Sequence, residues 1–421
     1  MSDLGCMKQL LSDVDVEWMA LGDIGEFIRG NGMQKKDFSN EGFPAIHYGQ
    51  IFTRYDLSAD KTFTYVPEQL AKKLKKAHKN DLLLATTSEN DKDVVKPLAW
   101  LGEEAAISGD MMLFRHAQNV KYLAYCFQTS AFQTQKQKYI SGAKVRRVSK
   151  DSLAKMYVPI PCPKDHKRSL EIQAEIVRIL DTLREISQKL TQELTQELVA
   201  RKNQYNYYRD VLLSFDQDGV DIKSLGELAK IQRGASPRPI VRYIANDENG
   251  VPWIKIGDTT PSSKLVTKTA QRITLEGSKK SRLLKKGDFI MSNSMSYGRP
   301  YILAIDGAIH DGWASISEFG KHLNSDFLYH YLSSNKVKNY WESKINSSSV
   351  SNLNSDIIRS LPIPMIPLDK QVSIAKTLDE FDALSCGIIA DLPKEIELRQ
   401  KQYEYYRDLL LSFPKPREAE V

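Results

Sequence analysis

The sequence predicts a mixed α/β protein in which two similar domains are joined by two long antiparallel coiled-coil helices. Three observations lead to this prediction. The 421 residues exceed one ordinary domain and can bury two cores. The second half of the chain repeats the first, and each half ends in a long amphipathic stretch. We therefore expect the following segments: a first α/β domain at 1–165, a central helix at 166–215, a second α/β domain at 216–366 and a C-terminal helix at 367–421.

The internal repeat is clearest at the two helix ends. Residues 205–215 read YNYYRDVLLSF and residues 403–413 read YEYYRDLLLSF, an offset of 198. The same offset relates Gln173 to Gln371, whereas landmarks in the domains keep their order at offsets between 203 and 208. A constant offset in the helices and a drifting one elsewhere indicate a duplicated scaffold whose loops have diverged. This predicts a pseudo-two-fold molecule.

The first helix is predicted by apolar residues spaced three and four apart. No glycine or proline falls between Glu171 and Phe215, which favours one continuous helix about 65 Å long. The second helix carries a matching stripe, but Gly387 and Pro393 should bend or break it. The first stripe consists of Ile172, Ile176, Ile179, Leu183, Ile186, Leu190, Leu194, Leu198, Tyr205, Tyr208, Leu212 and Phe215.

The centre of the first helix contains Thr-Gln-Glu-Leu twice in tandem, at 191–198. Four residues make nearly one turn, so each unit lengthens a helix by about 6 Å and almost keeps its apolar face in register. We expect this segment to act as a ruler for the separation of whatever the two domains bind.

Short apolar runs edged by turn residues predict strands between the helices. The predicted strands are 44–48, 81–85, 252–256 and 288–291. Polar loops follow them or their neighbours, at 29–32, 86–90, 233–238, 292–299 and 346–350.

Several catalytic classes are disfavoured. The sequence contains no Gly-x4-Gly-Lys-Ser/Thr phosphate loop, no G-x-G-x-x-G turn and no Asn/Asp-Pro-Pro-aromatic string. Glu276-Gly277-Ser278-Lys279 resembles the acid-x-Lys end of a nuclease site but lacks an upstream Pro-Asp, so we interpret it as a surface turn. The four cysteines lie far apart, which argues against a zinc site or a disulfide framework, and no apolar stretch is long enough for a membrane span. We expect a cytoplasmic protein without a catalytic site.

Charge and loop composition favour a DNA duplex as the ligand. Residues 171–215 hold seven acids and six bases, and residues 371–421 hold ten acids and seven bases, so of the net +6 the remaining chain carries +10. Lys and Arg neutralise phosphates, while Asn, Gln, Ser and Arg can contact base edges. Any one cluster of Lys and Arg residues in the sequence could equally be a charged surface that faces solvent. The candidate DNA contacts are Arg29, Asn31, Gln34, Lys35, Lys36, Thr87, Asn90, Lys144 and Arg146 in the first half, and Arg233, Ser236, Arg238, Lys255, Asn293, Ser296, Tyr297, Arg299, Ser348 and Ser349 in the second.

The Tyr-rich helix ends predict a docking surface for partner proteins. Tyr207 and Tyr405 fall off the apolar stripes, and exposed aromatic residues are typical interface anchors. They could instead pack on the neighbouring domain. The candidate partner contacts are Tyr205, Tyr207, Tyr208, Arg209, Tyr403, Tyr405, Tyr406 and Arg407.

Taken together, these motifs resemble the specificity subunit of type I restriction-modification enzymes over essentially the whole chain. The resemblance is carried by the two Tyr-x-Tyr-Tyr-Arg-Asp helix ends, by 233–239 (RGASPRP), by 253–258 (WIKIGD) and by 349–353 (SVSNL). The tandem Thr-Gln-Glu-Leu is similar to a tetrapeptide repeat in one subgroup of that family. The first domain departs from the pattern, because residues 29–36 read RGNGMQKK.

The resemblance implies a non-catalytic subunit that recognises a bipartite DNA site. It also implies two modification subunits that use S-adenosylmethionine to methylate adenine, and two restriction subunits that use ATP and Mg for translocation and cleavage. Two alternatives remain open at this point. One is a self-contained methyltransferase or nuclease with a degenerate motif, and the other is a coiled-coil scaffold.

Overall fold

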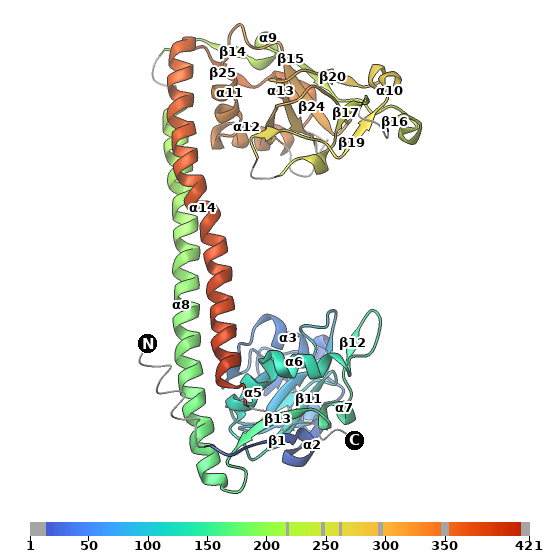
Figure 1. Cartoon of the computed structure of the whole chain (residues 1–421), viewed down its shortest axis with the longest axis vertical. Helices are drawn as coiled ribbons and strands as arrows, with labels where there is room; N and C mark the ends of the chain where they lie inside the picture. Colours follow the sequence, from blue (N-terminus) through green and yellow to red (C-terminus); the bar gives the residue numbers. More distant parts are fainter. Residues whose placement is uncertain are drawn as a thin grey trace. The chain divides into compact units, whose positions relative to one another are not determined.

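The computed structural model describes residues 14–215, 219–245, 249–260, 263–293, 298–346 and 353–413. The chain forms two compact units, one made of residues 1–193 and 395–421 and the other of residues 194–394. Each unit contains one α/β domain with a segment of each long helix, so the two helices are shared between the units (Figure 1).

The first unit is organised around two sheets. A five-stranded sheet has the order β2-β11-β7-β9-β4, and a four-stranded sheet has the order β5-β3-β10-β6. Two short pairs, β1-β13 and β12-β8, complete it. The strands are β1 Val16–Ala20, β2 Gly25–Arg29, β3 Phe43–Ile46, β4 Ser58–Ala59, β5 Thr64–Val66, β6 Lys76–Ala77, β7 Leu82–Ala85, β8 Thr87–Ser88, β9 Lys96–Trp100, β10 Ala105–Ile107, β11 Met111–His116, β12 Arg146–Arg147 and β13 Tyr157–Pro161.

The second unit repeats most of this topology, but β16 is an added edge strand, and the described residues contain no counterpart of the pair β12-β8. Its sheets have the orders β15-β24-β21-β22-β18 and β16-β19-β17-β23-β20, and β14 pairs with β25 as β1 pairs with β13. The parallel pairs β3-β10 and β4-β9 recur as β17-β23 and β18-β22. The duplication is therefore structural as well as sequential. The strands are β14 Ile222–Ser224, β15 Lys230–Arg233, β16 Ile244–Ala245, β17 Val251–Ile254, β18 Leu265–Val266, β19 Gln271–Ile273, β20 Arg282–Leu284, β21 Phe289–Ser292, β22 Pro300–Leu303, β23 Gly307–Ile309, β24 Trp313–Ser317 and β25 Pro362–Pro364.

Short helices connect the strands and also recur. The α-helices of the first domain are α2 Leu21–Ile24, α3 Tyr48–Thr53, α4 Glu68–Ala71, α5 Val120–Gln128, α6 Ser130–Gln137 and α7 Lys150–Ala154; those of the second are α9 Leu225–Leu228, α10 Leu275–Lys279, α11 Ser325–Leu332, α12 Asn335–Asn346 and α13 Ser355–Arg359. Single turns of 3-10 helix occur at η1 Lys35–Asp37, η2 Ile240–Tyr243 and η3 Ile256–Asp258.

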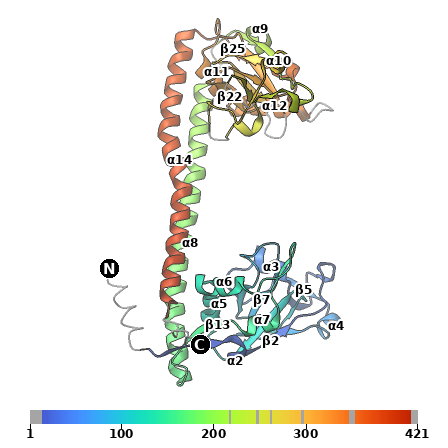
Figure 2. The ribbon, with the colours of Figure 1, turned by 45° about the vertical axis from the view of Figure 1, so that its right-hand side comes forward.

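The long helices α8 (His166–Leu212) and α14 (Leu368–Leu410) enter the domain cores at their ends. In the first unit Ile176 and Leu180 of α8 and Leu410 of α14 belong to the same buried cluster. In the second unit Leu378 of α14 packs in a cluster with Leu213, just after α8. Each core thus contains the start of one long helix and the end of the other, and the two helix segments within a unit run antiparallel (Figures 1 and 2).

Matched polar contacts reinforce this attachment. Gln173 accepts a hydrogen bond from the Asn119 amide at 2.9 Å, and Gln371 accepts one from the Asn324 amide at 2.8 Å. Ser130 donates to Asp408 in the first unit, as Asn335 donates to Asp210 in the second. The segment from α5 to the start of α6 in the first unit, and the segment from α11 to the start of α12 in the second, therefore contact both long helices.

The predicted elements correspond closely to these. The four predicted strands are β3, β7, β17 and β21, shifted by one or two residues. Of the predicted bend or break in the second helix, the break is wrong, since α14 continues through Pro393, and the bend stays a prediction. The prediction that Ile186 lies on the packed apolar stripe of the first helix is also wrong, because this residue is 59% exposed.

Candidate nucleic-acid interface

A glycine forms the same close turn in both domains, directly after an arginine. A Cβ on Gly30 would lie 2.1 Å from the Ser108 carbonyl oxygen, and one on Gly234 would lie 2.0 Å from that of His310. Only glycine permits this approach of two backbone segments. Arg29 Nε then donates to the Gly109 carbonyl at 3.3 Å, and Arg233 Nε donates to the Asp311 carbonyl at 3.2 Å. The Arg-Gly motif therefore fixes a turn, and both arginines are exposed at it.

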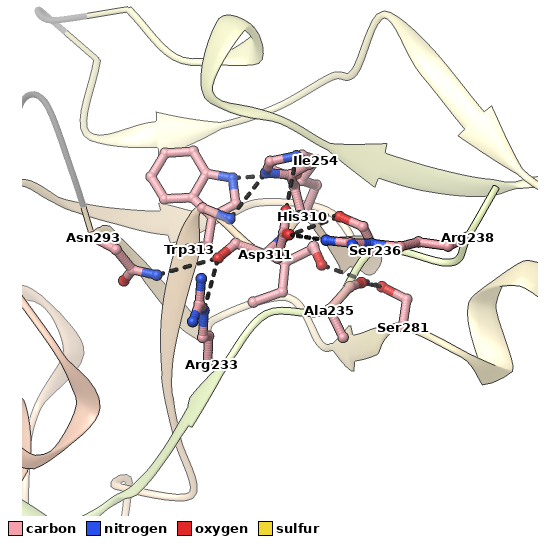
Figure 3. A network of polar contacts seen from close by, with 12 residues as sticks. Arg233, Ala235, Ser236, Arg238, Ile254, Ser281, Asn293, His310, Asp311 and Trp313 are labelled. Carbon is pink, nitrogen blue, oxygen red and sulfur yellow. Dashed lines mark hydrogen bonds and ion pairs between the residues drawn. The ribbon is translucent and has the colours of Figure 1, made fainter. Parts of the chain in front are cut away.

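In the second domain this turn carries a polar network (Figure 3). The Ser236 hydroxyl donates to Asp311 Oδ1 at 2.9 Å, and His310 Nε2 lies 3.0 Å from the same oxygen. Arg238 Nη2 lies 3.6 Å from Asp311 Oδ2, with its side chain 84% exposed. The sequence predicted Arg233, Ser236 and Arg238 as candidate contacts but not their neighbours His310 and Asp311, which lie on the loop between β23 and β24.

A cleft of about 380 Å³ opens beside this network. Lys255 lies in its wall and donates from Nζ to Gln271 Oε1 at 2.8 Å. Trp253, which is 1% exposed, and Ile244 supply apolar surface. Basic, amide and imidazole groups thus converge on one concave surface with an apolar wall. Such a surface can contact both the phosphates and the base edges of a duplex.

Asn293 approaches the network from β21. Its Nδ2 donates to the Asp311 carbonyl at 3.3 Å, and its backbone carbonyl accepts from the Leu353 amide at 3.1 Å. The buried Oδ1 of Asn293 has no partner among the described residues. Four further predicted contacts lie outside the described residues: Ser296, Tyr297, Ser348 and Ser349.

The first domain presents different residues at the equivalent turn. Asn31 is committed to structure, since Nδ2 donates to the Lys73 carbonyl at 2.8 Å and Oδ1 accepts from the Lys75 amide at 2.7 Å. Gln34 precedes η1, and its backbone N–H donates to the Asp37 carboxylate at 2.8 Å. Lys35 and Lys36 are exposed on that turn.

A second polar loop of the first domain is clamped between two short strands. Thr87 in β8 is buried and pairs with Arg147 in β12. Arg146 Nε lies 2.8 Å from Asp91, and its Nη1 donates to the Gly142 carbonyl at 2.6 Å. Asn90 is exposed and donates to Asp93 at 2.8 Å, and Lys144 is exposed nearby in sequence.

No sequence pattern indicates the residue that anchors this loop. Lys136 is 1% exposed, and its Nζ donates to the carbonyls of Lys92 and Val94, both at 2.9 Å. Burial lowers the pKa of this ammonium to about 8, against the opposing charges of Asp93 and Asp91. The loop is therefore tethered to α6 by a buried cation.

Arg299 does not line the cleft that contains Arg238. It lines a cleft of about 550 Å³ together with Tyr205, Arg209 and Asp382 of the long helices. This predicted DNA contact therefore shares its surroundings with two of the predicted partner contacts.

The predicted partner contacts separate into exposed and buried groups. Tyr207 and Tyr405 are 65% and 63% exposed, so the expectation that they lie off the packed stripe is confirmed. Each contacts its neighbour edge to face, with ring centroids 5.5 Å apart in both Tyr207–Tyr208 and Tyr405–Tyr406. Arg209, Arg407 and Tyr403 are buried instead.

One cluster in the second unit has the composition of a metal site. His330, Asp379 and Asp382 have ligand atoms within 4.8 Å of one another. However, Lys264 Nζ already lies 2.8 Å from Asp379 and 2.7 Å from Asp326. An ammonium therefore balances the carboxylates, and the cluster joins the second domain to α14. In the first unit the Tyr125 hydroxyl donates to Asp181 at 2.7 Å and joins the first domain to α8.

Comparison with known proteins identifies the family of the chain. The family model described as type I restriction modification DNA specificity domain matches residues 13–199 and 217–398. The chain belongs to the type I restriction-modification specificity subunits. It is 33% identical to the EcoR124I/EcoR124II specificity subunit of Escherichia coli over 99% of both chains, and 31% identical to a putative specificity subunit of Haemophilus influenzae over 65% of this chain and 68% of that protein.

Solved structures show the same fold at low sequence identity. A chain from a structure of type I restriction-modification complex assembly and conformational transition superposes with a TM-score of 0.74 at 15% identity, covering 94% of this chain and 97% of that one. The HsdS subunit from Thermoanaerobacter tengcongensis superposes with a TM-score of 0.55 at 15% identity, covering 94% and 96%. Among the described helices of this specificity subunit, none has the length and apolar character needed to cross a bilayer.

Proposed function

We propose that this specificity subunit binds a bipartite DNA site, with one half-site contacted by each α/β domain. The observation that supports this most strongly is a repeated scaffold with unlike residues at equivalent positions. The Arg-Gly turn and its sheets occur twice, yet Asp311 stands where the first domain has Gly109, and Lys255 stands where it has His47. Two recognition surfaces of the same shape and different chemistry suit two half-sites of different sequence.

Within each half-site, exposed lysines and loop residues have different roles. Lysines such as Lys35, Lys36 and Lys285 are exposed and suit phosphates, which contribute affinity without sequence preference. Residues positioned by Asp311 suit base edges, because positioned donors discriminate between acceptor patterns. Ser236 donates a hydrogen bond to this carboxylate, and the Arg238 guanidinium lies 3.6 Å from it.

The partners proposed are two modification subunits that methylate adenine and two restriction subunits that translocate and cleave DNA. The pairs Tyr207–Tyr208 and Tyr405–Tyr406 each include an exposed ring, so they supply one aromatic surface in each unit and hence two docking places. In this proposal S-adenosylmethionine, ATP and Mg bind to the partner subunits, and this chain contributes no catalytic group.

Two binding measurements on the purified full chain test the proposal. Affinity for a duplex pool should fall steeply with salt, with a log-log slope of about −0.9 for each phosphate neutralised. S-adenosylmethionine should not bind detectably to the chain alone. Binding of that cofactor would favour the self-contained methyltransferase instead, and absence of DNA binding both alone and with the modification subunits would favour a scaffold.

A further inference from the structure

We propose that Arg238 recognises a guanine in the half-site bound by the second domain, and that Asp311 positions it for this task. The inference rests on the proposed DNA-binding function and adds to it the identity of one base and a residue that no sequence motif indicated.

The carboxylate of Asp311 is held rigidly. The Gly312 amide donates to His310 Nδ1 at 2.9 Å, which leaves the proton of a neutral imidazole on Nε2, facing Asp311 Oδ1 at 3.0 Å. Ser236 donates to the same oxygen and accepts from the Asp311 amide at 3.3 Å. Oδ1 therefore has two donors, and Oδ2 remains for Arg238 (Figure 3).

The carboxylate is also ionised. Burial opposes ionisation, but the hydrogen bond from Ser236, followed by the neighbouring His310 and then Arg238, holds the pKa of Asp311 below its ordinary value. A fixed negative charge thus lies beside a guanidinium whose side chain is 84% exposed.

This arrangement suits a base better than a phosphate. A carboxylate 3.6 Å from the guanidinium would repel a phosphate brought to the same arginine, whereas it leaves a neutral acceptor edge unopposed. Only Nη2 of Arg238 lies near Asp311, so the other N–H groups of the guanidinium can make a bidentate contact. In the major groove guanine presents two acceptors, O6 and N7, and their pairing with arginine is the commonest specific contact.

Among the described residues, the equivalent turn of the first domain lacks this arrangement, because Gly109 has no side chain and Gln34 is uncharged. Elsewhere in that domain, Arg146 is engaged through Nε and Nη1 by Asp91 and Gly142, and Arg115 is engaged through Nε and Nη2 by Asp81. Changes to Asp311 or Arg238 should therefore alter one half-site only.

The test uses the full chain bound to its co-expressed modification subunit, with a pool of duplexes of randomised sequence as the probe. Bound duplexes are sequenced to give the base preference at each position for the wild-type, R238A, R238K and D311N proteins. R238A should lower the preference for guanine at one position by about 5- to 150-fold, and the point charge of R238K should not restore it. D311N should lower the same preference while raising affinity for unrelated duplexes, because a negative charge facing DNA is lost. Unfolding cannot raise that affinity. E318Q, which removes a carboxylate paired with Lys230 in the same domain, should leave the preference unchanged.

The outcomes separate the two proposals. If the wild-type complex enriches no bipartite motif, the proposed function fails. If it does but the half-site altered by R238A contains no guanine, or if R238A and D311N leave both half-sites unchanged, the assignment of Arg238 is overturned and the proposed function stands.

Discussion

Replacing the buried Gln371 by methionine should detach the second domain from α14 locally. Gln371 is 0% exposed, and its Nε2 donates to the carbonyls of His322 at 3.0 Å and Ile366 at 2.9 Å, while Oε1 accepts from the Asn324 amide. Methionine keeps the volume but leaves one buried N–H and two carbonyls without these partners. An unsatisfied buried group costs about 1–3 kcal/mol, so with partial compensation by water we expect a loss of about 3 kcal/mol.

Hydrogen exchange monitored by mass spectrometry measures this loss where it occurs. A loss of about 3 kcal/mol corresponds to roughly 100-fold faster exchange of amides in α11. The matched control is Q400M on the same helix, whose exposed amide bonds only to Glu404 and should change stability by less than about 0.5 kcal/mol. If Q371M left the exchange of α11 within about threefold of wild type, the attachment through Gln371 would be refuted.

Three further predictions follow from other parts of the molecule. Burial lowers the pKa of His116 to about 4 from 6.5, so the first domain should keep its full stability above pH 6.5 and lose up to about 3 kcal/mol as the pH falls toward 4. In H116N the side-chain oxygen can replace Nδ1 as acceptor of the Gln118 backbone amide, so the dependence of unfolding free energy on pH, measured by urea titration, should become flatter. An unchanged pH dependence would contradict this prediction. The double variant Y207S/Y405S should lose co-purification with the modification subunit at unchanged helicity, whereas persistence of the complex would rule out these aromatic residues as anchors. One more Thr-Gln-Glu-Leu unit should lengthen the DNA spacer by one or two base pairs and keep both half-sites, and a constant spacer in methylation maps would show that α8 is not the ruler.

The sequence predicted elements more successfully than contacts. Apolar runs identified β3, β7, β17 and β21, because burial of a strand depends on residues that are adjacent in sequence. The break predicted at Pro393 fails because a proline removes one helical hydrogen bond, a local cost that the surrounding helix α14 can absorb.

The contacts of the site depend on distant residues. Ser236 and Asp311 are 75 positions apart, and Lys136 reaches the carbonyl of Lys92 across 44 positions. No local pattern relates such pairs, since the topology of the sheets brings them together. The repeat did single out Gln173 and Gln371, but only the structure shows that both are buried and hold the start of a domain helix.

The central claim is that this chain determines which DNA sequence its partners act on. Mapping methylated adenines across a host genome with the gene, without it, and with the R238A variant tests this most directly. If this chain determines the sequence, one bipartite methylated motif should disappear without the gene and change in a single half-site with R238A. An unchanged methylation map after removal of the gene would contradict it.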